Sequence, residues 1–171
     1  TRAFRVEQVG CRMSGDSFFS GKRILVTGAA GTVGSRLIER LLKQPVAEVF
    51  GIDNNENDLF HLAEAQKSDR RFQSFVCDIR SPGELRNLLK RMDFCFHTAA
   101  FKHVPSSERA PFETVQTNIL GLQNLIQAAL ANEVGRVLFT SSDKAVNPTN
   151  VMGTSKRMGE RLITAANATL H

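Results

Sequence analysis

A glycine-rich segment, Gly28-Ala29-Ala30-Gly31-Thr32-Val33-Gly34, lies between a short apolar run and an amphipathic pattern, and this order narrows the possible folds to a few. The run over 23–27 is typical of a buried strand and the pattern over 32–43 of a helix. Glycines here allow a tight turn, close approach of backbone N–H groups to a pyrophosphate, and close packing of the helix on the strand. A glycine-rich turn that only reverses the chain is the alternative interpretation. The helix N-terminus adds partial positive charge. The segment therefore predicts a dinucleotide phosphate loop, and the helix is expected to face the sheet through Val33, Leu37, Leu41 and Leu42.

Apolar runs alternate with helical patterns along the rest of the chain. Strands such as Ile24-Leu25-Val26 are continuously apolar rather than alternating, which is typical of a parallel sheet covered by helices on both faces. Ser81-Pro82-Gly83-Glu84 predicts a capping box at a helix start. We expect an α/β fold, a doubly wound parallel (Rossmann) sheet whose crevice lies at the carboxyl ends of the strands. The expected strands are 23–27, 47–52, 72–77, 94–98 and 136–141, and the expected helices are 32–43, 58–66, 82–91, 112–131 and 151–168.

Size and charge limit the class of protein. A chain of 171 residues with 42% hydrophobic residues predicts one globular domain, over 21–171, after a lead-in or linker over 1–20 that ends in turn formers and exposed aromatic residues. The net charge of +5 is scattered along the chain, which favours a phosphorylated small molecule over nucleic acid.

Cysteine usage and hydropathy bear on location. Cys11, Cys77 and Cys95 are odd in number, so we expect thiols in a reducing compartment rather than disulfides, with the last two buried in strands. No stretch is long and apolar enough to cross a bilayer, and the first residues lack a signal-peptide pattern. A cytoplasmic location follows as an expectation.

Acidic residues follow the second and third expected strands. Asp53, with Asn54 beside it, stands where a carboxylate accepts a hydrogen bond from the adenosine ribose, which favours NAD over NADP. A turn built by Asp53 with its two asparagine neighbours is the alternative. Asp78 and Ile79 are expected to flank the adenine, and a strand-end cap is their alternative role.

Longer motifs identify a family resemblance. Gly28-x-x-Gly31-x-x-Gly34 resembles the fingerprint of the extended short-chain dehydrogenase/reductases, and His97-Thr98-Ala99-Ala100 is similar to the family segment that lines the cofactor. Three further blocks resemble the polysaccharide-biosynthesis branch, whose members are UDP-N-acetylglucosamine 4,6-dehydratases. They are Ala100-Phe101-Lys102-His103-Val104-Pro105, Thr117-Asn118-Ile119, and Ser142-Asp143-Lys144-Ala145-Val146-Asn147-Pro148-Thr149-Asn150-Val151-Met152-Gly153-Thr154-Ser155-Lys156-Arg157.

The chain departs from the family pattern in two ways. Met152 stands four residues before Lys156, where most relatives have a tyrosine, and the chain contains no tyrosine. Methionine at this place resembles the large, membrane-anchored members of the branch, which would put the protein at the cytoplasmic face of the inner membrane. The family's catalytic unit also continues well past this length, so we expect the fold to stop before the substrate-binding part.

The resemblance implies a reaction in three steps. Carbon 4 of the sugar is oxidised with hydride passing to NAD, water leaves across carbons 5 and 6, and the hydride returns to carbon 6. Asp143 would protonate the departing 6-hydroxyl and Lys144 would remove the carbon 5 proton, which requires shifted pKa values for both. A salt-bridged pair that caps the next helix is the alternative for these two residues.

The remaining site residues are also implied by the resemblance. Lys156 would bind the nicotinamide ribose, although a surface lysine is the alternative. Ser142 would hydrogen-bond the sugar 4-hydroxyl, whose proton would pass to Asp143 or to an ordered water.

One loop and one helix are also expected near the site. Lys102 and His103 follow the fourth strand, where they would meet cofactor or sugar, and the spacing of His97, Cys95 and His103 predicts no metal site. Asn118, within the long helix, is expected to hold a backbone group or water beside the cofactor. By family likeness the same helix, from Phe112, would form a homo-oligomer surface.

Three functions remain open from the sequence. The first is an NAD-dependent dehydratase of a UDP-linked amino sugar in polysaccharide biosynthesis. The second is a nucleotide-sugar epimerase, which would keep a tyrosine and lack the Asp143-Lys144 pair. The third is a non-catalytic NAD-binding module, favoured by the missing tyrosine and opposed by Ser142-Asp143-Lys144 and Lys156.

Overall fold

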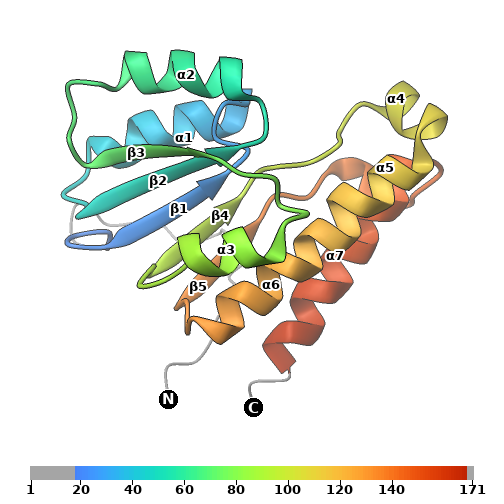
Figure 1. Ribbon diagram of the computed structural model, residues 1–171. Helices are drawn as coiled ribbons and strands as arrows, with labels where there is room; N and C mark the ends of the chain where they lie inside the picture. Colours follow the sequence, from blue (N-terminus) through green and yellow to red (C-terminus); the bar gives the residue numbers. More distant parts are fainter. Residues whose placement is uncertain (1–17, 169–171) are drawn as a thin grey trace.

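The fold is a five-stranded parallel sheet between two layers of helices, in a computed structural model that describes residues 18–168 (Figure 1). The strand order is β3-β2-β1-β4-β5, and neighbouring strands pair in parallel throughout. The order reverses between β1 and β4, so a crevice is expected where these two strands end. The strands are β1 (Arg23–Thr27), β2 (Glu48–Asp53), β3 (Phe72–Val76), β4 (Phe94–His97) and β5 (Arg136–Phe139).

Each face of the sheet has its own hydrophobic core. The helices α1 (Thr32–Leu42) and α2 (Glu56–Ala65) cover one face, where Ile38, Leu41 and Leu59 pack against the strands. The other face is covered by α3 (Pro82–Leu88), α6 (Leu122–Ala131) and α7 (Val151–Ala168). Because both faces are buried, Ile24, Leu25 and Val26 are all inaccessible to solvent, as the continuously apolar pattern predicts.

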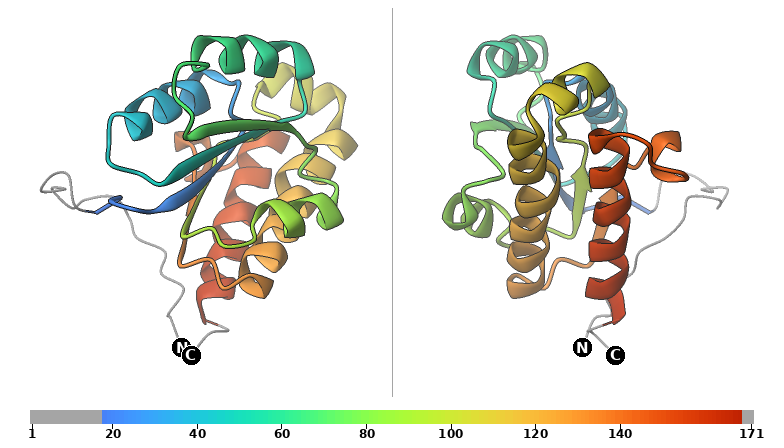
Figure 2. Two further views of the ribbon diagram at one scale, coloured as in Figure 1. Left: turned by 60° about the vertical axis from the view of Figure 1, so that its left-hand side comes forward. Right: turned by 90° about the vertical axis from the view of Figure 1, so that its right-hand side faces the viewer.

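The expected long helix over 112–131 is built from three pieces. It comprises α5 (Pro111–Val115), the π-helical segment η1 (Gln116–Gly121) and α6, and it runs beside α7 (Figure 2). A further short helix, α4 (Val104–Arg109), begins one residue before Pro105 and was not expected from the sequence. A last short element, the 3₁₀ turn η2 (Asp143–Ala145), follows β5.

Two local expectations are corrected by the structure. Ser81 does precede α3, with Pro82 in its first turn, but its side chain makes no capping hydrogen bond, so the capping box is absent. Of the aromatic residues at the end of the lead-in, Phe18 is exposed as expected, whereas Phe19 is half-buried. Phe19 packs edge-on against Phe94, and Arg136 lies 4.9 Å above the ring of Phe18. The rest of the lead-in, residues 1–17, lies outside the described residues, as does Cys11.

Both described cysteines are buried as expected, Cys95 in β4 and Cys77 directly after β3. Cys77 and Cys95 are free and buried, and burial raises the pKa of both thiols to about 12. Between residues 18 and 168, no helix combines the length and apolar character needed to cross a membrane.

Candidate functional site

The glycine-rich loop connects the end of β1 to the start of α1, as the sequence predicts. Gly28 has a φ of +67°, and a Cβ atom there would lie 2.6 Å from the backbone nitrogen of Ala99. A Cβ atom on Gly34 would overlap the carbonyl oxygen of Gly28. Side chains are therefore excluded at both positions, and the backbone at the N-terminus of α1 is open to an anionic group.

Val33 does not face the sheet, contrary to the expectation for this helix. It is 59% exposed and lines the groove described below, whereas Ile38 takes the buried position on α1. Leu41 and Leu42 are buried as expected, and Leu37 is half-buried. The apolar side chain of Val33 is thus available to a ligand at the loop.

The acid at the end of β2 is bonded to the glycine-rich loop. Asp53 Oδ2 accepts a hydrogen bond from the Ala30 nitrogen at 3.1 Å, and Oδ1 accepts one from the Asn55 nitrogen at 3.0 Å. Asp53 therefore makes the turn contact that was its alternative role. Each carboxylate oxygen keeps a lone pair for a ribose hydroxyl, because a carboxylate accepts about four hydrogen bonds.

The residues after β3 form the neighbouring wall. Asp78 pairs with Arg80 at 2.6 Å, and the hydrogen bonds of the Arg80 side chain lower the pKa of this carboxyl. Ile79 is buried against the π-helical segment, where a Cβ atom on Gly121 would lie 2.8 Å from its side chain. Because Gly121 has no side chain, Ile79 fits between the π-helical segment and the neighbouring groove.

Two adjoining cavities form a groove across the carboxyl ends of the strands. Their volumes are about 230 Å³ and 280 Å³, and both are lined by the phosphate loop and by the segment after β4. Residues common to the two are Gly28, Gly31, Thr98, Ala100 and Lys102. The first adds Ile52, Asp53, Asn54, Cys77, Asp78, Ile79, Ala99, Phe101 and Thr117, and the second adds Thr32, Val33, Gly34, Thr140, Ser141, Ser142, Lys144, Met152 and Lys156.

Ser142, Asp143 and Lys144 lie at the second cavity's end of the groove, in and beside η2. The Ser142 hydroxyl donates to Asp143 Oδ1 at 2.9 Å, and Lys144 Nζ lies 3.3 Å from the same oxygen. The Asp143 side chain is 83% exposed, and the Ser142 hydroxyl, followed by Lys144, lowers its pKa. This is the salt-bridged alternative, and the pKa shift is opposite to the one that an acid catalyst requires. The pair does not cap α7, because Glu108 accepts from the Val151 nitrogen at the start of that helix.

Lys156 lies on the buried side of α7, one turn after Met152. Its side chain donates to the Thr140 carbonyl oxygen at 2.9 Å and lies 4.8 Å from the centre of the Phe139 ring. Lys156 is only 5% exposed, and this burial lowers its pKa to about 8. Lys156 is therefore not an exposed surface lysine, which was its alternative role.

Beneath Lys156 lies a second buried titratable side chain. His97 stacks on Phe139 and shares a 2.7 Å hydrogen bond with the Thr27 hydroxyl. Burial, followed by the charge of Lys156, lowers the pKa of His97 to about 3. The imidazole packed against Phe139, on which Lys156 also lies, is therefore neutral.

Asn118 forms a clamp inside the π-helical segment. Its Oδ1 accepts from the Phe101 nitrogen at 2.8 Å, and its Nδ2 donates to the Phe101 oxygen and to Ser155 Oγ, each at 2.9 Å. The clamp joins the loop after β4 to α7. Asn118 therefore acts on backbone, as expected, and is not among the residues that line the two cavities.

Lys102 and His103 are separated by the fold. Lys102 lines both cavities, whereas His103 precedes α4 and lines neither. Thr98 lines the groove as its segment predicted, whereas Phe101, Thr140 and Ser141 line the groove but were given no role from the sequence. Their place just after a strand was the signal that could have identified them.

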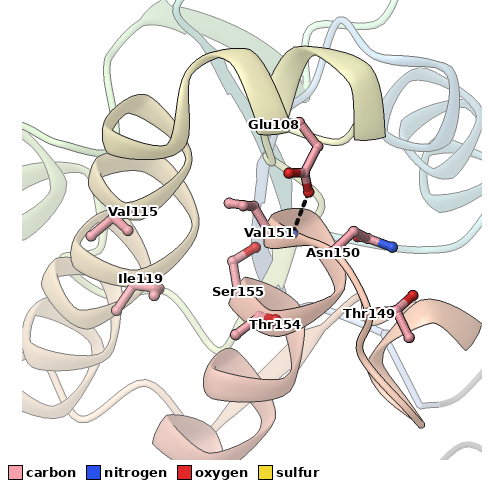
Figure 3. A pocket seen from close by; sticks show the side chains of 8 residues that line it. All are labelled: Glu108, Val115, Ile119, Thr149, Asn150, Val151, Thr154 and Ser155. Atoms are coloured by element: carbon pink, nitrogen blue, oxygen red, sulfur yellow. Dashed lines mark hydrogen bonds between the residues drawn. The ribbon is translucent and has the colours of Figure 1, made fainter.

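A third cavity of about 360 Å³ lies between α4, the π-helical segment and the start of α7 (Figure 3). Glu108 reaches across it to the Val151 nitrogen, at 2.7 Å. This carboxylate occupies the end of α7 that would otherwise attract an anion. The larger volume does not make this cavity the functional site, because it lacks the glycine loop and the groups at the strand ends.

A glycine-rich loop at the reversal point of a parallel sheet, with an acid after the second strand, defines a Rossmann-type dinucleotide-binding domain. Sequence comparison then identifies the family, since the profile of the polysaccharide biosynthesis protein family matches residues 24–171. The chain belongs to this family, a branch of the extended short-chain dehydrogenase/reductases.

Individual relatives carry different names. The chain is 42% identical over 151 residues to an uncharacterized membrane protein of Methanocaldococcus jannaschii, covering 88% of this chain and 45% of that protein. It is 36% identical over 154 residues to a UDP-glucose 4-epimerase of Rickettsia bellii, covering 86% and 44%. The dTDP-glucose 4,6-dehydratase DesIV of Streptomyces venezuelae, solved with NAD and TYD bound, superposes with a TM-score of 0.81 at 29% identity, covering 86% and 52%. The chain thus spans about half the length of these proteins.

Proposed function

We propose that the chain is the cofactor-binding half of an NAD-dependent nucleotide-sugar 4,6-dehydratase acting on a UDP-N-acetylglucosamine type of substrate. The observation that carries the proposal is the meeting of Ser142 and Lys144 with Lys156 in one groove, in a chain that lacks tyrosine. Free thiols at Cys77 and Cys95 fit a reducing, cytoplasmic location.

The residues of the groove fit NAD. The pyrophosphate would lie against the backbone at the N-terminus of α1, beside Gly28 and Gly34, where a Cβ atom does not fit. Asp53 would accept from the adenosine ribose and repel a 2′-phosphate, Ile79 would pack on the adenine, and Lys156 would bind the nicotinamide ribose. When bound, NAD takes up and returns a hydride, which makes carbon 5 of the sugar acidic between the two transfers.

The polar groups after β5 would act on the sugar. Ser142 would hydrogen-bond the 4-hydroxyl, Lys144 would remove the carbon 5 proton, and Asp143 would protonate the departing 6-hydroxyl. Asp143 can act as an acid only when its carboxylate is shielded from water, because its pKa is lowered in the exposed state described above. Substrate and the remaining half of the enzyme would supply that shielding.

A second candidate is a nucleotide-sugar epimerase. The 36% identity to a UDP-glucose 4-epimerase favours it. Epimerisation needs a base for the 4-hydroxyl but no acid and base for carbons 5 and 6. The Asp143-Lys144 pair therefore favours dehydration.

The test combines the protein at the length of its relatives with NAD and UDP-N-acetylglucosamine. A dehydratase yields a product lighter by one water, whereas an epimerase yields a product of unchanged mass that separates from the substrate by chromatography. NAD binding without any product supports the non-catalytic module. Lys144→Ala should stop the exchange of the carbon 5 proton with solvent while NAD affinity stays within about threefold. Unchanged exchange would remove Lys144 from the mechanism.

A further inference from the structure

The missing tyrosine leaves the first step without an obvious proton acceptor. Met152, which occupies the corresponding position on α7, is buried and has no group that can take a proton. Asp143 is a poor acceptor, since the hydrogen bonds from Ser142 and Lys144 lower the pKa of its carboxyl. Oxidation of the 4-hydroxyl needs another base within the groove.

Lys156 supplies a buried amine in the same groove. It follows Met152 by one helical turn, so both side chains leave the same face of α7, and both line the second cavity with Ser142. Its polar contact is the Thr140 carbonyl oxygen, which accepts a hydrogen bond from a neutral amine as well as from an ammonium. Among the described residues, Lys156 makes no ion pair with a carboxylate.

Burial lowers the pKa of Lys156, and the titratable groups near it come from β4 and the loop after it, from η2 and from α7. From β4, His97 faces it as a neutral imidazole, and Lys102 in the loop after β4 lines the same cavity. From η2, Lys144 lines the cavity while paired with Asp143. From α7 itself, Glu160 is engaged by Arg157 and by the Ser141 hydroxyl. None of these groups forms an ion pair with Lys156 among the described residues, so no carboxylate offsets the burial that disfavours its ammonium form.

We propose that the neutral amine of Lys156 accepts the proton of the sugar 4-hydroxyl during oxidation at carbon 4, in place of the missing tyrosine. The O–H bond breaks and an N–H bond forms on Nζ. The C–H bond of carbon 4 breaks with its electron pair leaving as hydride to NAD, and the former O–H electrons become the second bond of the carbonyl. The proton later leaves Lys156 to solvent. This proposal rests on the proposed function, which supplies the sugar and the hydride acceptor.

The first arm of the test needs no catalysis. Lysine side chains labelled with ¹³C at Cε are titrated by NMR in the cofactor-free, relative-length protein, and Lys156→Arg assigns the Lys156 signal by its disappearance. The expected midpoint is about 8, compared with the ordinary lysine value of 10.5. A midpoint at the ordinary value overturns the proposal.

The second arm measures hydride transfer in a single turnover with NAD and UDP-N-acetylglucosamine, by the near-ultraviolet absorbance of reduced nicotinamide. The wild-type rate should rise with pH through the same midpoint. Lys156→Arg keeps the charge but not the base, so the rate should fall about 100-fold or more and lose this pH dependence. NAD affinity, measured by calorimetry, should change much less. Lys156→Gln provides a second variant if arginine is not accommodated, and Lys90→Arg on the exposed surface serves as the matched control.

The outcomes separate the two proposals. If the wild-type protein binds NAD but no nucleotide sugar reduces the bound NAD, the proposed function is refuted, and the proposed role of Lys156 is refuted with it. A wild-type protein that turns over, together with Lys156 variants that keep the same pH dependence and rate, overturns the role of Lys156 alone.

Discussion

Replacing Gly121 with alanine tests how the π-helical segment shapes the groove. The new Cβ atom would lie 2.8 Å from both Cγ1 and Cδ1 of Ile79. Ordinary carbon–carbon contacts are about 3.5–4.0 Å, so Ile79 has to move by about 1 Å. The space available to it is the cavity that it lines with Asp53 and Asp78.

The size of the effect follows from two opposing contributions. Overpacking a core costs about 1–3 kcal/mol, while alanine gains about 1 kcal/mol over glycine inside a helix. Gly83 in α3 is the matched control, because nothing lies within 4 Å of a Cβ atom there and only the gain remains. The difference in unfolding free energy between the two variants therefore isolates the clash, at about 1–3 kcal/mol.

The assay is urea denaturation of both variants, followed by calorimetric titration with NAD. Gly121→Ala should be the less stable variant and should bind NAD more weakly, because Ile79 enters the groove. Gly83→Ala should be slightly more stable than wild type with unchanged NAD affinity. If both variants gain stability equally and bind NAD equally, the packing argument for Gly121 is wrong.

Three further outcomes are expected. Asn118→Ala leaves both backbone groups of Phe101 without their partner, and should cost about 2–4 kcal/mol in chemical denaturation. Asp53→Ala should weaken NAD binding about tenfold in calorimetry and narrow the preference over NADP. The folded-state pKa of His97, about 3, lies below its ordinary value of 6.5, so the unfolded chain binds this proton first. Stability should therefore be lost as the pH falls from about 6.5 toward 3, and His97→Phe should reduce that loss in pH-dependent denaturation.

The parts of the site that the sequence predicts are those attached to strand ends. Asp53, Asp78 and Ser142 stand at or just after the ends of expected strands, so their place at one edge of a parallel sheet follows from the fold class alone. Gly28 and Gly34 are also predictable, because their spacing after the first strand is that of a dinucleotide phosphate loop. In the structure the backbone at both positions leaves no room for a side chain.

The parts that escaped prediction depend on packing between distant segments. No sequence pattern distinguishes the π-helical segment from an α-helix. The segment lies where Asn118 bonds to Phe101 and where Gly121 packs against Ile79. Val33 follows the apolar spacing of α1 yet is exposed, because its position in the first turn places it over the groove. The protonation of Asp143 depends on what shields it, which no local pattern encodes.

The central position of β1 in the sheet has a consequence for folding during translation. β1 pairs with β4 as well as β2, and Thr27 meets His97 across a separation of 70 residues. During translation the early strands leave the ribosome well before their later neighbour, so the middle of the sheet cannot assemble until β4 has emerged. Until then the apolar edge of β1 is unprotected, and a nascent chain stalled in this interval should depend on chaperones to remain unaggregated.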